Sequence, residues 1–142
     1  MANRLSNLCG QEWNGEGELW TDPAGNIAIH YQCALAVEES RVSYSWVHEG
    51  QVIHGAISLD ADGASWSDEW HQQETVRCNY VADSWGIFAV QCEYGAPEGQ
   101  RWGWRIALSE RPDASLVLQM TNIAPWGEEG RAVRMVFNQI KA

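Results

Sequence analysis

The stretch EWNGEGELW, residues 12–20, holds two tryptophans, two glycines and three glutamates in nine positions. Because successive side chains of a β-strand point to opposite faces, Trp13, Gly15, Gly17 and Leu19 share one face of this segment. Glycine inside a strand costs about 0.5–1 kcal/mol relative to alanine, so two of them predict a sharp bend or the close approach of another group. We expect a first strand that curls across the end of a barrel and plugs it with Trp13.

Apolar and polar residues alternate with period two along the rest of the chain, which is typical of half-buried β-strands. Turn sequences such as DADG at 60–63 and ERPDAS at 110–115 separate the alternating segments. Only ANRLSNLC, residues 2–9, suits a short helix. The pattern predicts about ten strands, near residues 11–20, 27–38, 41–48, 51–59, 64–71, 75–81, 85–94, 101–109, 114–123 and 132–141.

Strands with one apolar face must close on themselves or stack as two sheets, because a wide open sheet leaves unpaired edges. The short connections join neighbours in sequence, whereas a Greek-key sandwich needs longer crossovers. We therefore predict an all-β fold, a closed antiparallel up-and-down β-barrel of about ten strands. Residues 1–142 are expected to form this single domain, since no linker or internal repeat divides them.

The charge and hydropathy of the chain exclude several classes of partner. The formal net charge is -10, from 19 acidic and 9 basic residues, and Lys141 is the only lysine. Binding to a phosphate backbone requires clustered basic residues, so we expect no nucleic-acid partner. No segment approaches the roughly 20 apolar residues of a membrane span, and MANRLSNLCG lacks the apolar run of a secretory signal. We expect a soluble, cytoplasmic protein.

The four cysteines, Cys9, Cys33, Cys78 and Cys92, form no CxxC pair and no zinc-finger spacing. We expect free thiols in a reducing compartment, with disulfides as the alternative if the chain is exported. Tryptophan is the unusual residue type, with nine copies. Since each indole can bury roughly 150–250 Å² of surface, the interior must be lined or filled with aromatic rings.

The segment LCGQEWNGEGELW, residues 8–20, resembles the Leu-x-Gly-x-Trp-x-Gly-x-Gly opening of nitrobindin-like and related small bacterial calycins. The calycin superfamily also includes lipocalins and fatty-acid-binding proteins. The resemblance implies a barrel of eight to ten strands around a cavity for a small, mostly apolar molecule. In lipocalins a basic side chain late in the chain packs over the first tryptophan, which implies Arg131 or Arg134 here.

Two calycin chemistries are disfavoured by the residues present. Nitrobindins hold haem through a histidine near the C-terminal end, whereas His30, His48, His54 and His71 all lie in the first half of this chain. Fatty-acid-binding proteins clamp a carboxylate with an Arg-x-Tyr pair in the last strand, and no tyrosine follows Tyr94. We expect no cofactor. A metal site is not expected either, because no HxH, HExxH or other ligand cluster occurs.

The residues expected to face the interior, where they either pack the core or bind a ligand, are Tyr44, Trp46, His48, Trp66, Trp70, Phe88, Tyr94, Trp102, Trp104, Met120 and Met135. Most apolar stripes are packed core, because protein interiors are filled to near-crystal density. A barrel of about ten strands is, however, wider than the eight-stranded kind that side chains nearly fill. This width favours a residual cavity.

Asp68 shares its parity with Trp66 and Trp70 in SWSDEW, so it is placed on the interior face if the tryptophans are. A buried carboxylate requires a partner, for which His48, His54, an arginine or a ligand is available. The alternative is that this strand is bulged or faces outward, leaving Asp68 in water or SWSDEW at a dimer surface.

These observations favour a binding or carrier protein that encloses a small apolar or amphipathic molecule. One alternative is an enzyme of the isomerase, cyclase or lyase type, with His48, His54, Asp68 or Tyr44 as acid and base. No nucleophile motif supports a specific reaction. A second alternative is an interaction protein with a filled barrel, whose exposed tryptophans form a subunit contact. Either a monomer or a homodimer is compatible with the sequence.

Overall fold

The computed structural model describes residues 4–22, 26–70, 74–82, 86–95 and 99–140. A short 3-10 helix, η1, spans Arg4–Asn7 and precedes the first strand. Ten strands follow: β1 (Glu12–Trp20), β2 (Ala28–Val37), β3 (Arg41–His48), β4 (Gln51–Leu59), β5 (Gly63–Asp68), β6 (Val76–Tyr80), β7 (Phe88–Gly95), β8 (Arg101–Glu110), β9 (Leu116–Ile123) and β10 (Glu129–Gln139). The helix and all ten strands lie within or close to the predicted segments.

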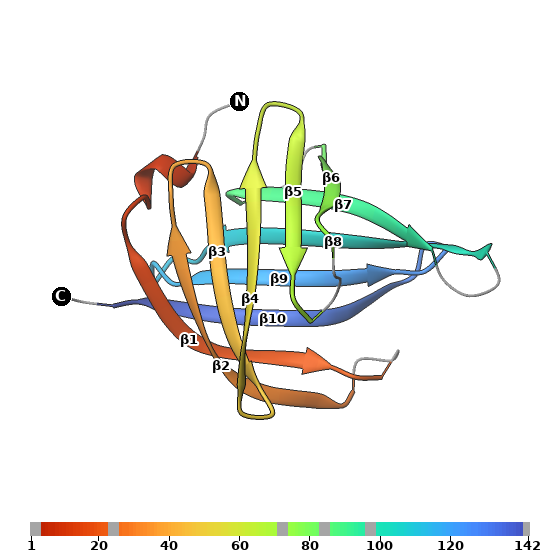
Figure 1. Cartoon of the computed structure of the whole chain (residues 1–142), viewed down its shortest axis with the longest axis horizontal. Coiled ribbons are helices and arrows are strands. Elements are labelled where there is room, and N and C mark those ends of the chain that lie inside the picture. Colours follow the sequence, from red (N-terminus) through yellow and green to blue (C-terminus); the bar gives the residue numbers. More distant parts are fainter. Residues whose placement is uncertain (1–3, 23–25, 71–73, 83–85, 96–98, 141–142) are drawn as a thin grey trace.

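The ten strands form one closed antiparallel sheet in which each strand pairs with its neighbour in sequence (Figure 1). Closure comes from β1, which pairs with β2 on one side and with β10 on the other. Gly15, for example, lies opposite Cys33 of β2 and Phe137 of β10. The predicted up-and-down barrel is therefore confirmed, and no strand of the sheet is left with an unpaired edge.

Up-and-down topology places alternate connections at opposite ends of the barrel. The closed end carries η1, the start of β1 and the connections β2–β3, β4–β5, β6–β7 and β8–β9. It lies at the upper left of Figure 1, where η1 is drawn. The open end carries the connections β1–β2, β3–β4, β5–β6, β7–β8 and β9–β10, and β1 runs toward it from Glu12 to Trp20.

The closed end is sealed by apolar side chains. Trp13 is only 2% exposed, and Leu5 of η1 is fully buried in the same core. A Cβ atom on Gly15 would lie 1.7 Å from the backbone oxygen of Val136, so only glycine permits this approach of β1 to β10. A Cβ on Gly17 would lie 2.4 Å from the ring of Tyr31. The two glycines thus allow the β10 backbone and the Tyr31 ring to approach β1 closely, as the sequence predicts.

The basic residue expected over Trp13 is not there. Arg131 instead lies over the ring of Trp20, with 4.4 Å between the guanidinium carbon and the ring centroid. Arg134 is exposed and lies opposite Glu18. In the antiparallel register of β1 and β10, Trp13 lies opposite Gln139 and Arg134 lies opposite Glu18, so Arg131 and Arg134 lie toward the open end of β1. The implied contact of Arg131 or Arg134 with Trp13 is therefore wrong.

Side chains of the described residues pack together in the interior of the barrel. Four buried indoles, those of Trp13, Trp46, Trp66 and Trp104, contribute to the core. The rings of Trp66 and Trp104 stack at 5.8 Å between centroids and 13° between planes. A gap too small for a water molecule remains between Leu19, Tyr31, Trp46, Asp68, Met120, Val133 and Met135. The width that ten strands provide is thus taken up largely by indole rings.

Candidate functional site at the open end

The open end contains a hollow of about 550 Å³, which we call the mouth pocket. It lies between the end of β1, the start of β8 and the β9–β10 connection. Its lining consists of Trp20, Thr21, Asp22, Trp102, Asn122, Ala124, Trp126, Glu128, Glu129, Gly130, Arg131 and Ala132. Indole rings supply much of the apolar surface, and acidic side chains outnumber the basic one.

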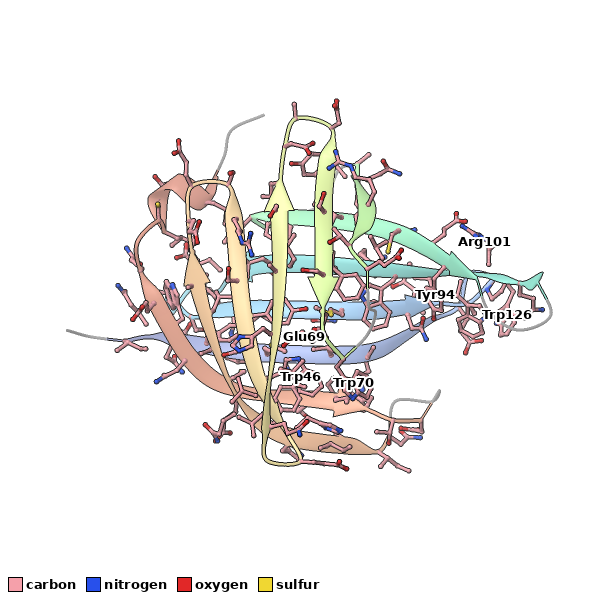
Figure 2. All side chains as sticks on the ribbon, viewed as in Figure 1. Trp46, Glu69, Trp70, Tyr94, Arg101 and Trp126 are labelled. Atoms are coloured by element: carbon pink, nitrogen blue, oxygen red, sulfur yellow. The ribbon has the colours of Figure 1, made fainter. Side chains whose placement is uncertain are left out.

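The indoles of the mouth pocket are arranged at an angle to one another. Trp102 and Trp126 meet edge to face, with 5.7 Å between ring centroids and 70° between planes. Trp126 is 66% exposed, whereas Trp20 and Trp102 are half-buried. The Trp126 indole N–H donates to an oxygen of Glu128 at 3.0 Å. Figure 2 shows Trp126 at the right-hand end of the barrel in this view, as it does Tyr94.

Tyr94 extends from β7 toward β9 at this end. Its hydroxyl donates a hydrogen bond to the amide oxygen of Asn122 at 2.5 Å. Asn122 is on β9 and lies opposite Trp104 of β8, the strand that separates β7 from β9 in the sheet. The mouth pocket therefore has a polar border at Asn122 next to its indoles, an arrangement that suits ligands with both apolar and polar parts.

A second aromatic group lies at the open end, on β2, on β3 and just after β5. We call it the rim cluster, and it comprises Tyr31, Trp46, His48 and Trp70. The ring centroids of Tyr31 and Trp46 are 5.0 Å apart, and the ring centroids of Trp46 and Trp70 are 5.6 Å apart. The His48 ring contacts both indoles, with centroid distances of 5.5 Å to Trp46 and 5.6 Å to Trp70. In Figure 2 Trp46 and Trp70 lie beside each other below the centre of the barrel. The indole nitrogen of Trp46 is buried with no hydrogen-bond partner among the described residues.

Beneath the rim cluster Asp68 is buried, with an exposed fraction of 2%. The Tyr44 hydroxyl donates to one carboxylate oxygen of Asp68 at 2.6 Å, and the Trp70 backbone N–H donates to the other at 2.8 Å. The Trp66 indole N–H in turn donates to the Tyr44 oxygen at 3.0 Å. The parity of β5 is thereby settled, because Trp66 and Asp68 both face inward. The alternative of an Asp68 in water is wrong, and the Tyr44 hydroxyl is one partner of its carboxylate.

Burial, together with the negative charge of Asp68, raises the pKa of Tyr44 well above its ordinary value. Burial also raises the pKa of Tyr31. Both phenols therefore keep their protons at neutral pH and act as hydrogen-bond donors rather than as bases. Room for the Tyr44 ring comes from Gly55 on β4, where a Cβ atom would lie 2.2 Å from the ring.

The predicted wall residues divide into two groups. The interior ones are Tyr44, Trp46, Trp66, Phe88, Trp104, Met120 and Met135, all of them buried. The others lie at the open end: Trp70 is 45% exposed, Tyr94 is 39% exposed, and His48 and Trp102 are half-buried. The expectation that Trp70 and Tyr94 are interior is wrong, because β5 ends at Asp68 and Tyr94 is the penultimate residue of β7.

Four residues were considered as acid or base, and two of them, Tyr44 and Asp68, are joined by a hydrogen bond at 2.6 Å. His54 is exposed on the outer face of β4, where its backbone N–H donates to Glu69 at 2.7 Å. Asp68 lies inside the barrel, and His48 packs among the indoles of the rim cluster. Within the described ranges no group of three His, Cys, Asp or Glu residues is placed to hold a metal ion.

Of the four thiols, Cys9 is exposed and Cys33, Cys78 and Cys92 are buried and free. Burial raises the pKa of Cys33 to about 12, so this thiol stays protonated. Among the residues that the structure describes, no helix has the length and apolar composition of a membrane span.

Sequence reasoning missed Trp20, Trp126 and Arg131 as site residues. Trp20 has the parity of the outward glutamates of β1, and Trp126 lies in a turn sequence, APWGEEG. A large indole between proline and glycine in a polar turn is the one signal that could have indicated an exposed aromatic site. Arg131 lies beside a bulge in β10, and the alternating pattern reveals neither this bulge nor the contact of Arg131 with Trp20.

No protein-family model matches the chain, and no curated protein matches it at a significant level. The fold and the site therefore define the class alone: a closed ten-stranded antiparallel β-barrel with an aromatic pocket at its open end, compatible with a calycin-like fold.

Proposed function

We propose that this protein is a calycin-like binding protein that holds a small apolar or amphipathic molecule in the mouth pocket. The observation that carries the proposal is a hollow of about 550 Å³ with three indoles in its wall, those of Trp20, Trp102 and Trp126. Pockets for small molecules typically measure roughly 300–1,000 Å³ and combine apolar and aromatic walls with a few polar groups.

The mouth pocket is a better location for the ligand than the deep interior, where the sequence led us to expect it. The gap around Trp46 and Asp68 does not admit a water molecule, so a ligand there would have to displace packed side chains. The mouth pocket already has the volume of a small molecule. Asn122, Glu128 and Arg131 add polar groups to its wall, which favours an amphipathic ligand over a purely apolar one.

The proposal is tested with N-phenyl-1-naphthylamine, an uncharged apolar probe whose fluorescence rises when it leaves water. We expect saturable binding to the intact protein, accompanied by a change in tryptophan emission. Replacing Trp126 with alanine removes an exposed indole from the pocket wall, and we expect about tenfold weaker binding.

Trp70→Ala is the matched control, because Trp70 is also a partly exposed indole at the open end but does not line the mouth pocket. We expect its affinity for the probe to stay within about twofold of the unmodified protein. The proposal fails if the unmodified protein shows no saturable binding. It also fails if Trp70→Ala weakens binding as much as Trp126→Ala does.

A further inference from the structure

The charges around the mouth pocket are mostly negative. Three acidic residues, Asp22, Glu128 and Glu129, line it against one basic residue, Arg131. Glu129 is paired with Arg105, whose second nitrogen lies 3.1 Å from a Glu129 oxygen. This pairing leaves the carboxylates of Asp22 and Glu128 against a single guanidinium in the wall. The chain as a whole carries a formal net charge of -10, which attracts cations toward every such opening.

Two of these acidic side chains, Asp22 and Glu129, stay ionised at neutral pH because their pKa values are lowered. The backbone N–H groups of Asn26 and Ile27 donate to the Asp22 carboxylate at 2.9 and 2.7 Å and lower its pKa. The Arg105 guanidinium lowers the pKa of Glu129 in the same way. The wall therefore presents fixed negative charge to a ligand, not carboxylic acids that could lose their charge near pH 7.

The aromatic faces of the pocket already accept a cation. The guanidinium of Arg131 lies over the ring of Trp20 at 4.4 Å, within the distance of a cation–π contact. Trp102 and Trp126 stand nearly perpendicular to each other in the same wall. Indoles set at an angle, with carboxylates beside them, are the components with which proteins bind quaternary ammonium groups.

We propose that the ligand of the mouth pocket is an organic cation, a protonated amine or quaternary ammonium joined to an apolar body. This inference rests on the proposed binding function and assigns a charge to its ligand. The apolar body lies against the indoles, and the cationic group lies between an indole face and the Asp22 and Glu128 carboxylates. An anionic ligand would meet these two carboxylates with only Arg131 to attract it.

The test compares three probes that share one alkyl chain, decyltrimethylammonium, decanol and decanoate, all below their micellar concentrations. Each is titrated against the intact protein carrying N-phenyl-1-naphthylamine, and the displacement of this uncharged reporter is measured. We expect decyltrimethylammonium to displace the reporter at a concentration about tenfold lower than decanol requires. Decanoate should be the weakest of the three.

Two variants change the charge of the pocket in opposite directions and test the assignment of a cationic ligand further. Glu128→Gln keeps the size of the side chain and an oxygen to accept the Trp126 N–H, but it removes one charge. We expect roughly threefold weaker displacement by decyltrimethylammonium and no change for decanol. Arg131→Gln removes the resident cation, and decyltrimethylammonium should then act at a lower concentration. Glu110→Gln, at the exposed closed end of β8, is the control that changes net charge away from the pocket.

The outcomes separate this inference from the proposed function. If decanoate displaces the reporter as well as decyltrimethylammonium does, or if all three probes act alike, the ligand is not a cation. The proposed function still stands in that case, because the uncharged reporter is bound. An effect of Glu110→Gln equal to that of Glu128→Gln would assign the preference to overall charge and overturn the pocket assignment. If the reporter itself does not bind, both proposals are overturned.

Discussion

The two ends of this barrel use the same residue type in opposite ways. At the closed end Trp13 is 2% exposed and is packed into the core that also contains Leu5 of the short helix. At the open end Trp126 is 66% exposed, and Trp70 is 45% exposed. The difference shows that indole content alone does not separate a structural core from a binding surface. What separates them is whether the ring is buried among the other side chains of the core.

The glycines show the same contrast. Gly15 in the first strand lies against the backbone of β10, where no side chain fits. Gly95, at the open end of β7, has no atom within 4 Å of the position that its Cβ would occupy. The backbone at Gly15 is therefore constrained by close packing, whereas the backbone at Gly95 is not.

The largest expected effect is on the closed-end indole. Trp13→Ala removes a fully buried side chain from a packed core, so we expect a loss of about 3–5 kcal/mol in the free energy of unfolding. Trp126→Ala, at the open end, should change stability by less than about 0.5 kcal/mol. Urea denaturation followed by circular dichroism measures both. Equal losses in the two variants would remove the distinction between the ends.

The next effect concerns the glycines. In Gly15→Ala the new methyl group would overlap a backbone oxygen, which cannot rotate away, and we expect a loss of about 1–3 kcal/mol or more. Gly95→Ala is the matched control and should be neutral or slightly stabilising, because it restricts the unfolded chain without a clash. The same denaturation measurement applies. A neutral Gly15→Ala would show that β1 and β10 are not held in close contact.

A third comparison uses two tyrosine hydroxyls. Tyr44→Phe removes the donor to the buried Asp68 and the acceptor of the Trp66 N–H, so we expect a loss of about 1–3 kcal/mol. Tyr94→Phe removes the bond to Asn122 at the exposed open end, where water can replace it, and should cost less than about 1 kcal/mol. Thermal unfolding separates the two. Similar losses would mean that Asp68 does not depend on the Tyr44 hydroxyl.

The smallest expected effect is a dependence of stability on pH at the closed end. Hydrogen bonds from Arg77 hold the pKa of Asp60 below its usual range. A carboxyl whose folded pKa is lowered contributes stability that is present above its unfolded pKa, about 3.9, and is lost as the pH falls toward the folded pKa. Asp60→Asn should therefore flatten the fall of the melting temperature between about pH 4 and pH 2. Since both side chains are about half exposed, the effect is small. If the melting temperature of Asp60→Asn falls with pH as that of the unmodified protein does, the Asp60–Arg77 pair contributes nothing to stability.

The sequence predicted the fold closely because its evidence is local. Alternation of apolar and polar residues places each strand, and the turn residues between strands indicate connections between neighbours. The ten strands of the structure lie at or near the predicted positions. The expected contact of Arg131 or Arg134 with Trp13 was wrong, because the register of β1 with β10 places Gln139, not an arginine, opposite Trp13.

The site could be predicted only in part. Alternation placed Tyr44 and Trp46 in the interior correctly, but it left open the parity of the strand that contains Trp66 and Asp68. The Tyr44 hydroxyl that bonds Asp68 lies 24 residues away in sequence, and Gly55 on a third strand makes room for its ring. Such a contact depends on the register of three strands, which no local pattern contains.

By itself the sequence determined a closed sheet with one dry face, since strand periodicity, turn residues and the glycines beside Trp13 act through neighbours along the chain. Only the tertiary structure decided which indoles are covered and which remain at the surface. Trp20, Trp102 and Trp126 come from distant segments and meet because β1 closes on β10. The pocket that they line is formed by strand ends and a bulge. Closure of the barrel sets the positions of these segments, and the alternating pattern does not predict them.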